Sequence, residues 1–174
     1  MIIGEKINLR PYNREDVRQF AALTNDLSYS SEFNFFGLRS PEIVEHSFEE
    51  DGFLHYQRGR LVVVTPDGTV VGMVSYHMEA YGPNDGSRVY NIGITLMQEQ
   101  RGKGYGTEAQ SLLASYLLAT FPVMRVEATT DIENLPEQRS LEKAGFTREG
   151  VLRKAQWRNG AHRDIVLYSK LRGE

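Results

Sequence analysis

The segment Gln100–Thr107 places a glycine at every second position, 102, 104 and 106, directly before a helix-forming run. Glycine adopts positive φ without strain and carries no Cβ that would hold a ligand away from the backbone. Val89–Leu96, ahead of this loop, is an apolar run typical of a strand, and residues 104–120 repeat apolar side chains at helical spacing. The sequence therefore predicts a strand, a tight glycine turn and a long helix in succession.

A glycine turn that opens a helix is a candidate phosphate site. The first amides of a helix lack carbonyl partners, and the helix dipole favours an anion there. Arg101 and Lys103 would add positive charge. A Walker loop is excluded because Tyr105 follows Gly104, and a dinucleotide fingerprint is excluded because the third glycine comes one residue too early. A glycine-rich helix cap without a ligand stays open as the alternative.

The composition excludes several other kinds of site. The chain has no cysteine, which rules out disulfides, thiolate metal sites and an acetyl-cysteine intermediate. Its four histidines lack the spacing of a zinc motif, so we expect no metal. The formal net charge of -3 shows no basic excess, so we expect no nucleic-acid partner. No secretory pattern or long apolar run occurs, which predicts a cytoplasmic protein without a membrane partner.

The 174 residues predict one domain, 1–174. Periodicity and turn residues predict strands at 7–10, 60–65, 69–79, 89–96 and 126–130, and a final pair from 151 to 171 turning at 159–160. They predict helices at 14–24, 41–50, 104–120 and 133–144. This order indicates an α/β (α+β) fold, with a single mixed, mainly antiparallel sheet of about seven strands flanked by about four helices.

Several segments, in chain order, resemble the GNAT superfamily of N-acetyltransferases. Arg101–Gly106 is similar to the R/Q-x-x-G-x-G/A signature of that family. Leu9–Asp16 resembles its L-R-P-x-x-x-x-D opening, and Asn134 with Leu141–Phe146 resembles its later N-x-x-x-x-x-x-L-E-K-x-G-F segment. The resemblance covers nearly the whole chain and favours the branch that holds the ribosomal-protein N-terminal acetyltransferases and many small-molecule acetyltransferases.

The resemblance implies acetyl-coenzyme A as the cosubstrate, bound in a cleft where the fourth and fifth strands splay apart. The fourth strand is the one at 89–96, and the amide of Thr95 is an implied donor to the reaction's oxyanion. Asn134 is also a preferred helix cap, and both roles can hold together. The implied cofactor contacts are Ile94, Thr95, Leu96, Arg101, Gly102, Lys103, Gly104, Tyr105, Gly106, Thr107 and Asn134.

The sequence departs from the family where protons are transferred. The tyrosine that many members carry seven residues after the asparagine is Leu141 here, and the serine that others carry three residues after it is Glu137. The acidic residue that is common on the fourth strand is Asn91. Glu137 shares a helix face with Asn134, so it is a candidate acid or base if its surroundings raise its pKa. The alternative is a first-turn acid that the helix dipole stabilises.

Two further candidate bases, His77 and Glu79, alternate on one face of the strand at 69–79. Histidine titrates near neutral pH, which suits a base, although a surface role is the ordinary one. A mechanism led by positioning needs no dedicated acid or base.

These observations predict an acetyl-coenzyme A-dependent N-acetyltransferase that moves an acetyl group to a primary amine by direct attack on the thioester. The acceptor is a protein N-terminus or a small-molecule amine, received by Ser28–Leu38 and the last hairpin. The missing tyrosine and serine leave open a non-catalytic acyl-coenzyme A sensor, and a transferase of a longer acyl group such as succinyl stays open too. Homodimers are common in the family, and the last hairpin is the interface we expect for one.

Overall fold

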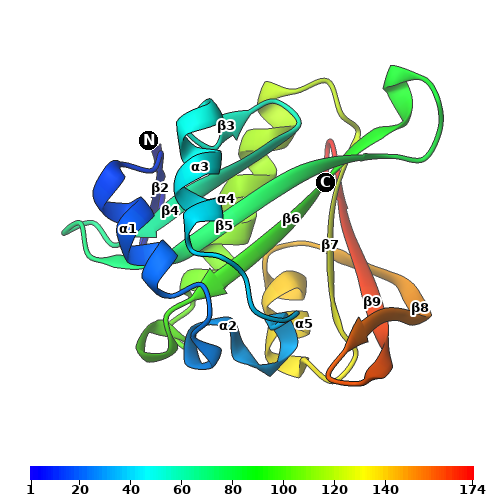
Figure 1. Ribbon diagram of the computed structural model, residues 1–174. Coiled ribbons are helices and arrows are strands. Elements are labelled where there is room, and N and C mark those ends of the chain that lie inside the picture. The colour runs from blue at the N-terminus through cyan, green and yellow to red at the C-terminus, as the bar shows by residue number, and fades with distance from the viewer.

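One open β-sheet of nine strands runs through the structure, a computed structural model that describes residues 1–174 (Figure 1). The strands are β1 (Ile2–Ile3), β2 (Asn8–Arg10), β3 (Leu54–His55), β4 (Arg58–Val64), β5 (Val70–Ala80), β6 (Arg88–Leu96), β7 (Arg125–Asp131), β8 (Thr147–Arg158) and β9 (Ala161–Leu171). The helices are α1 (Arg14–Ala22), α2 (Leu27–Asn34), α3 (Glu42–Asp51), α4 (Tyr105–Thr120) and α5 (Leu135–Lys143). The predicted mixed α/β class is confirmed, with nine strands in place of about seven and five helices in place of about four.

The additional elements carry little periodic pattern. The strands β1 and β3 have two residues each, which is too short to show an alternation. Helix α2 buries none of its residues, and Ser31 inside it has a non-helical φ of 62°. Its start is set locally, because the Asp26 side chain accepts a hydrogen bond from the amide of Ser28 at 2.8 Å.

The sheet order is β1-β2-β4-β5-β6-β7-β9-β8, and the short β3 pairs with β4 outside this order. The sheet contains one parallel pair, β6 with β7, which α4 connects. This pair is short: it begins at Tyr90–Val126 and ends at Ile92–Ala128. Strand β6 continues to Leu96, still paired with β5 on its other side. The edge of β6 that faces β7 is therefore unpaired beyond Ile92, which confirms the predicted splay between the fourth and fifth strands.

Helices cover both faces of the sheet and bury two separate cores. On one face, Leu113 and Leu117 of α4 pack with strand residues that include Leu61 of β4. On the other face, Phe20 of α1 packs with Val62 of β4. Because successive strand side chains point to opposite faces, this two-sided burial explains the continuous apolar run in β4. None of the helices is both long and apolar enough to cross a bilayer.

The N-terminal motif connects β2 to α1. Both terminal nitrogens of the Arg10 guanidinium donate to the Asp16 carboxylate, at 2.6 and 2.8 Å. Asp16 also accepts from the amide of Asn13, which itself caps α1. Burial alone would raise the pKa of Asp16, but the bonds from Arg10 and Asn13 outweigh it and lower that pKa. The motif thus has a structural role, far along the chain from the glycine loop.

Candidate active site

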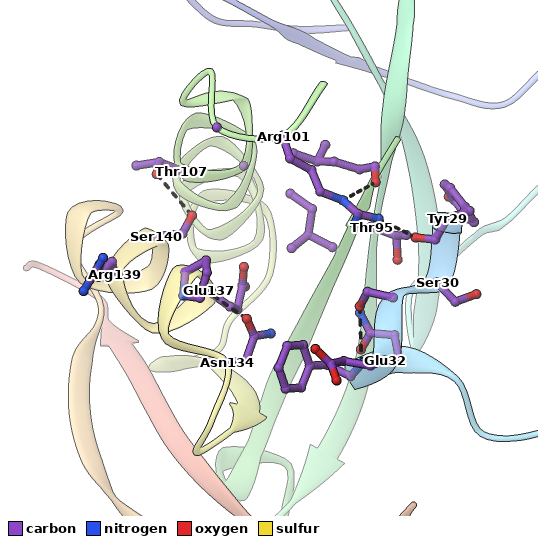
Figure 2. A pocket seen from close by; sticks show the side chains of 18 of the residues that line it. Tyr29, Ser30, Glu32, Thr95, Arg101, Thr107, Asn134, Glu137, Arg139 and Ser140 are labelled. Atoms are coloured by element: carbon purple, nitrogen blue, oxygen red, sulfur yellow. Dashed lines mark hydrogen bonds between the residues drawn. The ribbon is translucent and has the colours of Figure 1, made fainter. Parts of the chain in front are cut away.

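The splay between β6 and β7 opens into a cavity of about 690 Å³ (Figure 2). Residues of α5 and of the first turn of α4 form one wall, and α2 with the end of β6 forms the other. A smaller chamber of about 90 Å³, lined by Ile92 and Ala128 among others, adjoins the cavity and shares Ile94, Asn134 and Glu137 with it. The cleft therefore extends from the glycine loop to the last paired residues of β6 and β7.

The glycine loop presents its backbone to this cavity. Gly102 and Gly104 have φ values of 77° and 86°, and both line the cavity. The first helical hydrogen bond of α4 joins the amide of Glu108 to the carbonyl of Gly104, at 3.2 Å. The amides of residues 105–107 therefore have no carbonyl partner in the helix. This open helix start with its dipole fits a phosphate group.

The predicted basic residues of the loop have other partners. Arg101 lines the cavity, but its guanidinium donates to the carbonyl oxygens of Leu96, Ser28 and Tyr29 at 2.8–3.1 Å. Lys103 donates to the side chain of Gln100 and does not line the cavity. Tyr105 does not line the cavity either, and its side chain packs against the core that α4 forms with the sheet. The glycines of the loop face the cavity, and the residues between them, Lys103 and Tyr105, face away from it. The structure therefore does not support cofactor contacts by the side chains of Lys103 and Tyr105.

The other implied cofactor contacts all line the main cavity: Ile94, Thr95, Leu96, Gly102, Gly104, Gly106, Thr107 and Asn134. Asn134 caps α5, since its Oδ1 accepts from the amide of Glu137 at 3.4 Å. Its Nδ2 donates to Thr130 Oγ1 at 3.1 Å, which fixes the amide at the mouth of the inner chamber. The capping role is confirmed, and the cofactor contact stays a prediction.

Glu137 lines both the main cavity (Figure 2) and the inner chamber. Its carboxylate accepts a hydrogen bond from Gln110 Nε2. Burial raises the pKa of Glu137 to about 7, and the bond from Gln110 offsets only part of that rise. A large share of this carboxyl is therefore protonated at neutral pH. Gln110 Oε1, buried beside the inner chamber, has no protein partner, which suits a site for a polar ligand.

The remaining candidates lie elsewhere. His77 Nε2 and Glu79 Oε1 are 3.0 Å apart on β5, both side chains are half-exposed, and neither lines the cavity. Leu141 is fully buried in the main core, and Asn91 is buried on β6. The structure thus brings Glu137 to the cleft and leaves His77 and Glu79 outside it.

Helix α2 is held over the cleft by two arginines. Arg101 binds its first residues, as described above, and Arg158 donates to the carbonyl oxygen of Phe33 at 3.2 Å. Arg158 is 4% exposed and forms a buried salt bridge with Asp131 at the end of β7. Glu32 and Phe33 line the cavity as expected for the acceptor side, whereas Trp157 of the last hairpin is 61% exposed.

Three features of the cleft were not predicted from the sequence. The first is that the segment Leu27–Asn34 is a helix, α2, because its residues show no helical periodicity. The second is Gln110, whose polar side chain is buried next to Glu137. The third is basic: Arg139 and Lys143 of α5 line the cavity, and Lys6 Nζ lies 3.4 Å from where a Cβ of Gly104 would stand. Helical spacing relates Arg139 to Lys143, but only the packing of α5 shows that they reach the cleft.

A mixed sheet that splays at its one parallel pair, with a glycine loop and an open helix start at the splayed end, is the fold of acetyltransferases. Residues 6–147 match the family described as Acetyltransferase (GNAT) domain, so the chain belongs to the GNAT family of acetyltransferases.

Two relatives are N-acetyltransferases. The SPbeta prophage-derived uncharacterized N-acetyltransferase YokL of Bacillus subtilis is 26% identical over 174 residues, which cover 98% of this chain and 93% of YokL. The spermidine N(1)-acetyltransferase of Escherichia coli K12 is 30% identical over 163 residues, which cover 94% of this chain and 84% of that enzyme. The family and these relatives identify the chain as an N-acetyltransferase.

Two solved structures share the fold. The spermidine N-acetyltransferase of Vibrio cholerae in complex with CoA and spermine superposes with a TM-score of 0.78 at 22% identity, over 97% of both chains. RimL, a ribosomal L7/L12 alpha-N-protein acetyltransferase in complex with coenzyme A, superposes with a TM-score of 0.80 at 17% identity, over 97% of this chain and 96% of RimL.

Proposed function

We propose that this N-acetyltransferase moves an acetyl group from acetyl-coenzyme A to a primary amine by direct attack on the thioester. The observation that carries the proposal is one continuous cleft, with free helix amides at the glycine loop and the Glu137 carboxyl at its inner end. Coenzyme A in the solved relatives of the same fold supports the choice of cosubstrate.

The residues of the cleft fit the two ends of this cosubstrate. The loop Gly102–Thr107 would hold the pyrophosphate through its amides, because no Cβ covers the backbone at the three glycines. The unpaired edge of β6, from Gly93 to Leu96, would hold the two amide groups of the pantetheine arm as a neighbouring strand would. Asn134 adds a side-chain amide on the opposite wall. When bound, acetyl-coenzyme A supplies the activated acetyl group as a thioester.

Glu137 is the proton donor of the proposed reaction. Its raised pKa of about 7 keeps a proton available at neutral pH. As the amine nitrogen bonds to the carbonyl carbon and the carbon–sulfur bond breaks, Glu137 gives this proton to the departing sulfur. The nitrogen releases a proton to water as the amide forms, and Glu137 takes up a proton from water to regain its acid form.

Strand alternation turns the amide of Thr95 toward β5, so the proposed donor to the oxyanion is the amide of Ile94, which faces the cleft. The ammonium proton of the acceptor passes to water. His77 and Glu79 stay outside this scheme.

The acceptor amine would approach along α2. Glu32 places a carboxylate on that wall, which favours a cationic amine. The relatives named for spermidine and for a ribosomal protein support two amine classes, a small polyamine and a protein N-terminus. A cytoplasmic location and a homodimer formed through β8 and β9 stay predictions.

A thiol-release assay tests the proposal. The protein is incubated with acetyl-coenzyme A and a panel of polyamines, aminoglycosides and peptides with free N-termini. We expect release of coenzyme A that depends on one class of amine, together with an acetylated product detected by mass spectrometry. Tight binding of acetyl-coenzyme A without turnover on any acceptor would favour a sensing module. Faster turnover with succinyl-coenzyme A would overturn the acetyl assignment.

A further inference from the structure

Two basic side chains of α5, those of Arg139 and Lys143, line the main cavity without an acidic partner. Both are exposed, and neither takes part in any salt bridge of the structure. They are four residues apart, so they leave the same face of the helix. A cation in the last helical turn also interacts favourably with the helix dipole, which accounts for Lys143 but not for Arg139. The pair gives one wall of the cleft two uncompensated positive charges.

The contact between α5 and α4 fixes the place of this pair along the cleft. Ser140, next to Arg139, has its Oγ 3.1 Å from Thr107 Oγ1 in the first turn of α4 (Figure 2). Glu137 instead contacts Gln110, almost one turn further along α4. The two helices are therefore antiparallel at this contact. Glu137 lies at the inner end of the cleft, and the basic pair lies toward the glycine loop.

The side chains of the glycine loop have no free charge for a phosphate group beyond the pyrophosphate. The guanidinium of Arg101 is bound to three backbone carbonyl groups, and the ammonium of Lys103 is bound to Gln100. The amides of the loop are assigned to the pyrophosphate. A further phosphate group in this cleft would find cations on α5.

We propose that Arg139 and Lys143 bind the 3′-phosphate of coenzyme A. This inference rests on the proposed function, because it needs the pyrophosphate on the glycine loop. The 3′-phosphate is a monoester with a charge of about −2 at neutral pH. A planar guanidinium and a mobile ammonium together can bind its oxygens. The enzyme therefore selects free coenzyme A over 3′-dephospho-coenzyme A and over the phosphopantetheine arm of a carrier protein, since both lack this phosphate.

Calorimetric titration with coenzyme A and with 3′-dephospho-coenzyme A tests the assignment without any need for turnover. The test variant is R139Q/K143Q. The matched control is R14Q/R18Q, which removes two exposed cations at the same spacing on α1, outside the cavity. We expect the unmodified protein and the control to bind coenzyme A at least about tenfold more tightly than the dephospho form. The test variant should bind both ligands with the affinity that the unmodified protein shows for the dephospho form.

Two results would overturn the assignment. One is equal affinity of the unmodified protein for both ligands. The other is an equal loss of affinity for both ligands in R139Q/K143Q, which would mean that the pair contacts the pyrophosphate. Failure of the unmodified protein to bind either ligand would contradict the proposed function itself, so the two failures are distinguishable.

Discussion

Replacement of Gly106 by valine should lower the affinity for coenzyme A by at least about 100-fold, or about 2.7 kcal/mol. A Cβ at this position would stand 3.5 Å from both Leu96 Cδ1 and Ser140 Oγ, in ordinary contact with the two walls of the cleft. The two methyl groups of valine then have only the cavity to occupy. Calorimetry or a thermal-shift titration with coenzyme A measures the loss.

The fold should survive this change. Gly106 has no positive φ, and valine is no worse than glycine inside a helix. Gly150→Val is the matched control, because a Cβ there meets no atom within 4 Å. Unchanged coenzyme A affinity of the Gly106→Val protein, with its circular dichroism and unfolding midpoint preserved, would contradict the placement of the cofactor.

Replacement of Glu137 by glutamine should lower kcat by about 100-fold and change the KM for acetyl-coenzyme A little, because general acid catalysis typically contributes this much. In the unmodified enzyme the active form of Glu137 is protonated, so kcat should fall as pH rises through about 7. The variant should lack that decrease. Glu133→Gln is the control, since Glu133 precedes the same helix but does not line the cavity. A variant that keeps full kcat and the same pH profile would remove Glu137 from the mechanism.

The same substitution has an effect on stability that is independent of turnover. The pKa of Glu137 is raised from 4.5 in the unfolded chain to about 7 in the fold. Between these values the folded state holds a proton that the unfolded state releases, so the contribution of Glu137 to stability falls as pH rises through this window. Glu137→Gln removes that loss. The variant should therefore gain stability relative to the unmodified protein at pH 8 and gain less at pH 5, as urea unfolding can measure.

The sequence predicted the elements that show their own periodicity or turn chemistry. The β4–β5 hairpin, the strand before the glycine loop and α4 follow from alternating or helical spacing and from turn residues. Helix α2 could not be predicted because it buries no residue, and the partners of its backbone are Arg101 and Arg158, far away along the chain.

The candidate site was predicted best where the backbone itself forms it. Gly102, Gly104 and Gly106 face the cavity because a loop of this kind needs residues without a Cβ. Side-chain directions did not follow from the sequence, since Lys103 turns to Gln100 and the positive charge comes from Arg139 and Lys143 on another helix. The pKa of Glu137 depends on burial next to Gln110, and that contact exists only in the folded chain.

A crystal structure of the protein with acetyl-coenzyme A tests the central claim most directly. We predict the pyrophosphate on the amides of Gly102–Thr107, the pantetheine arm along β6 between Gly93 and Leu96, and the thioester next to Glu137. A cofactor bound outside the splay of β6 and β7, or one that lies there with its thioester away from Glu137, would contradict the account.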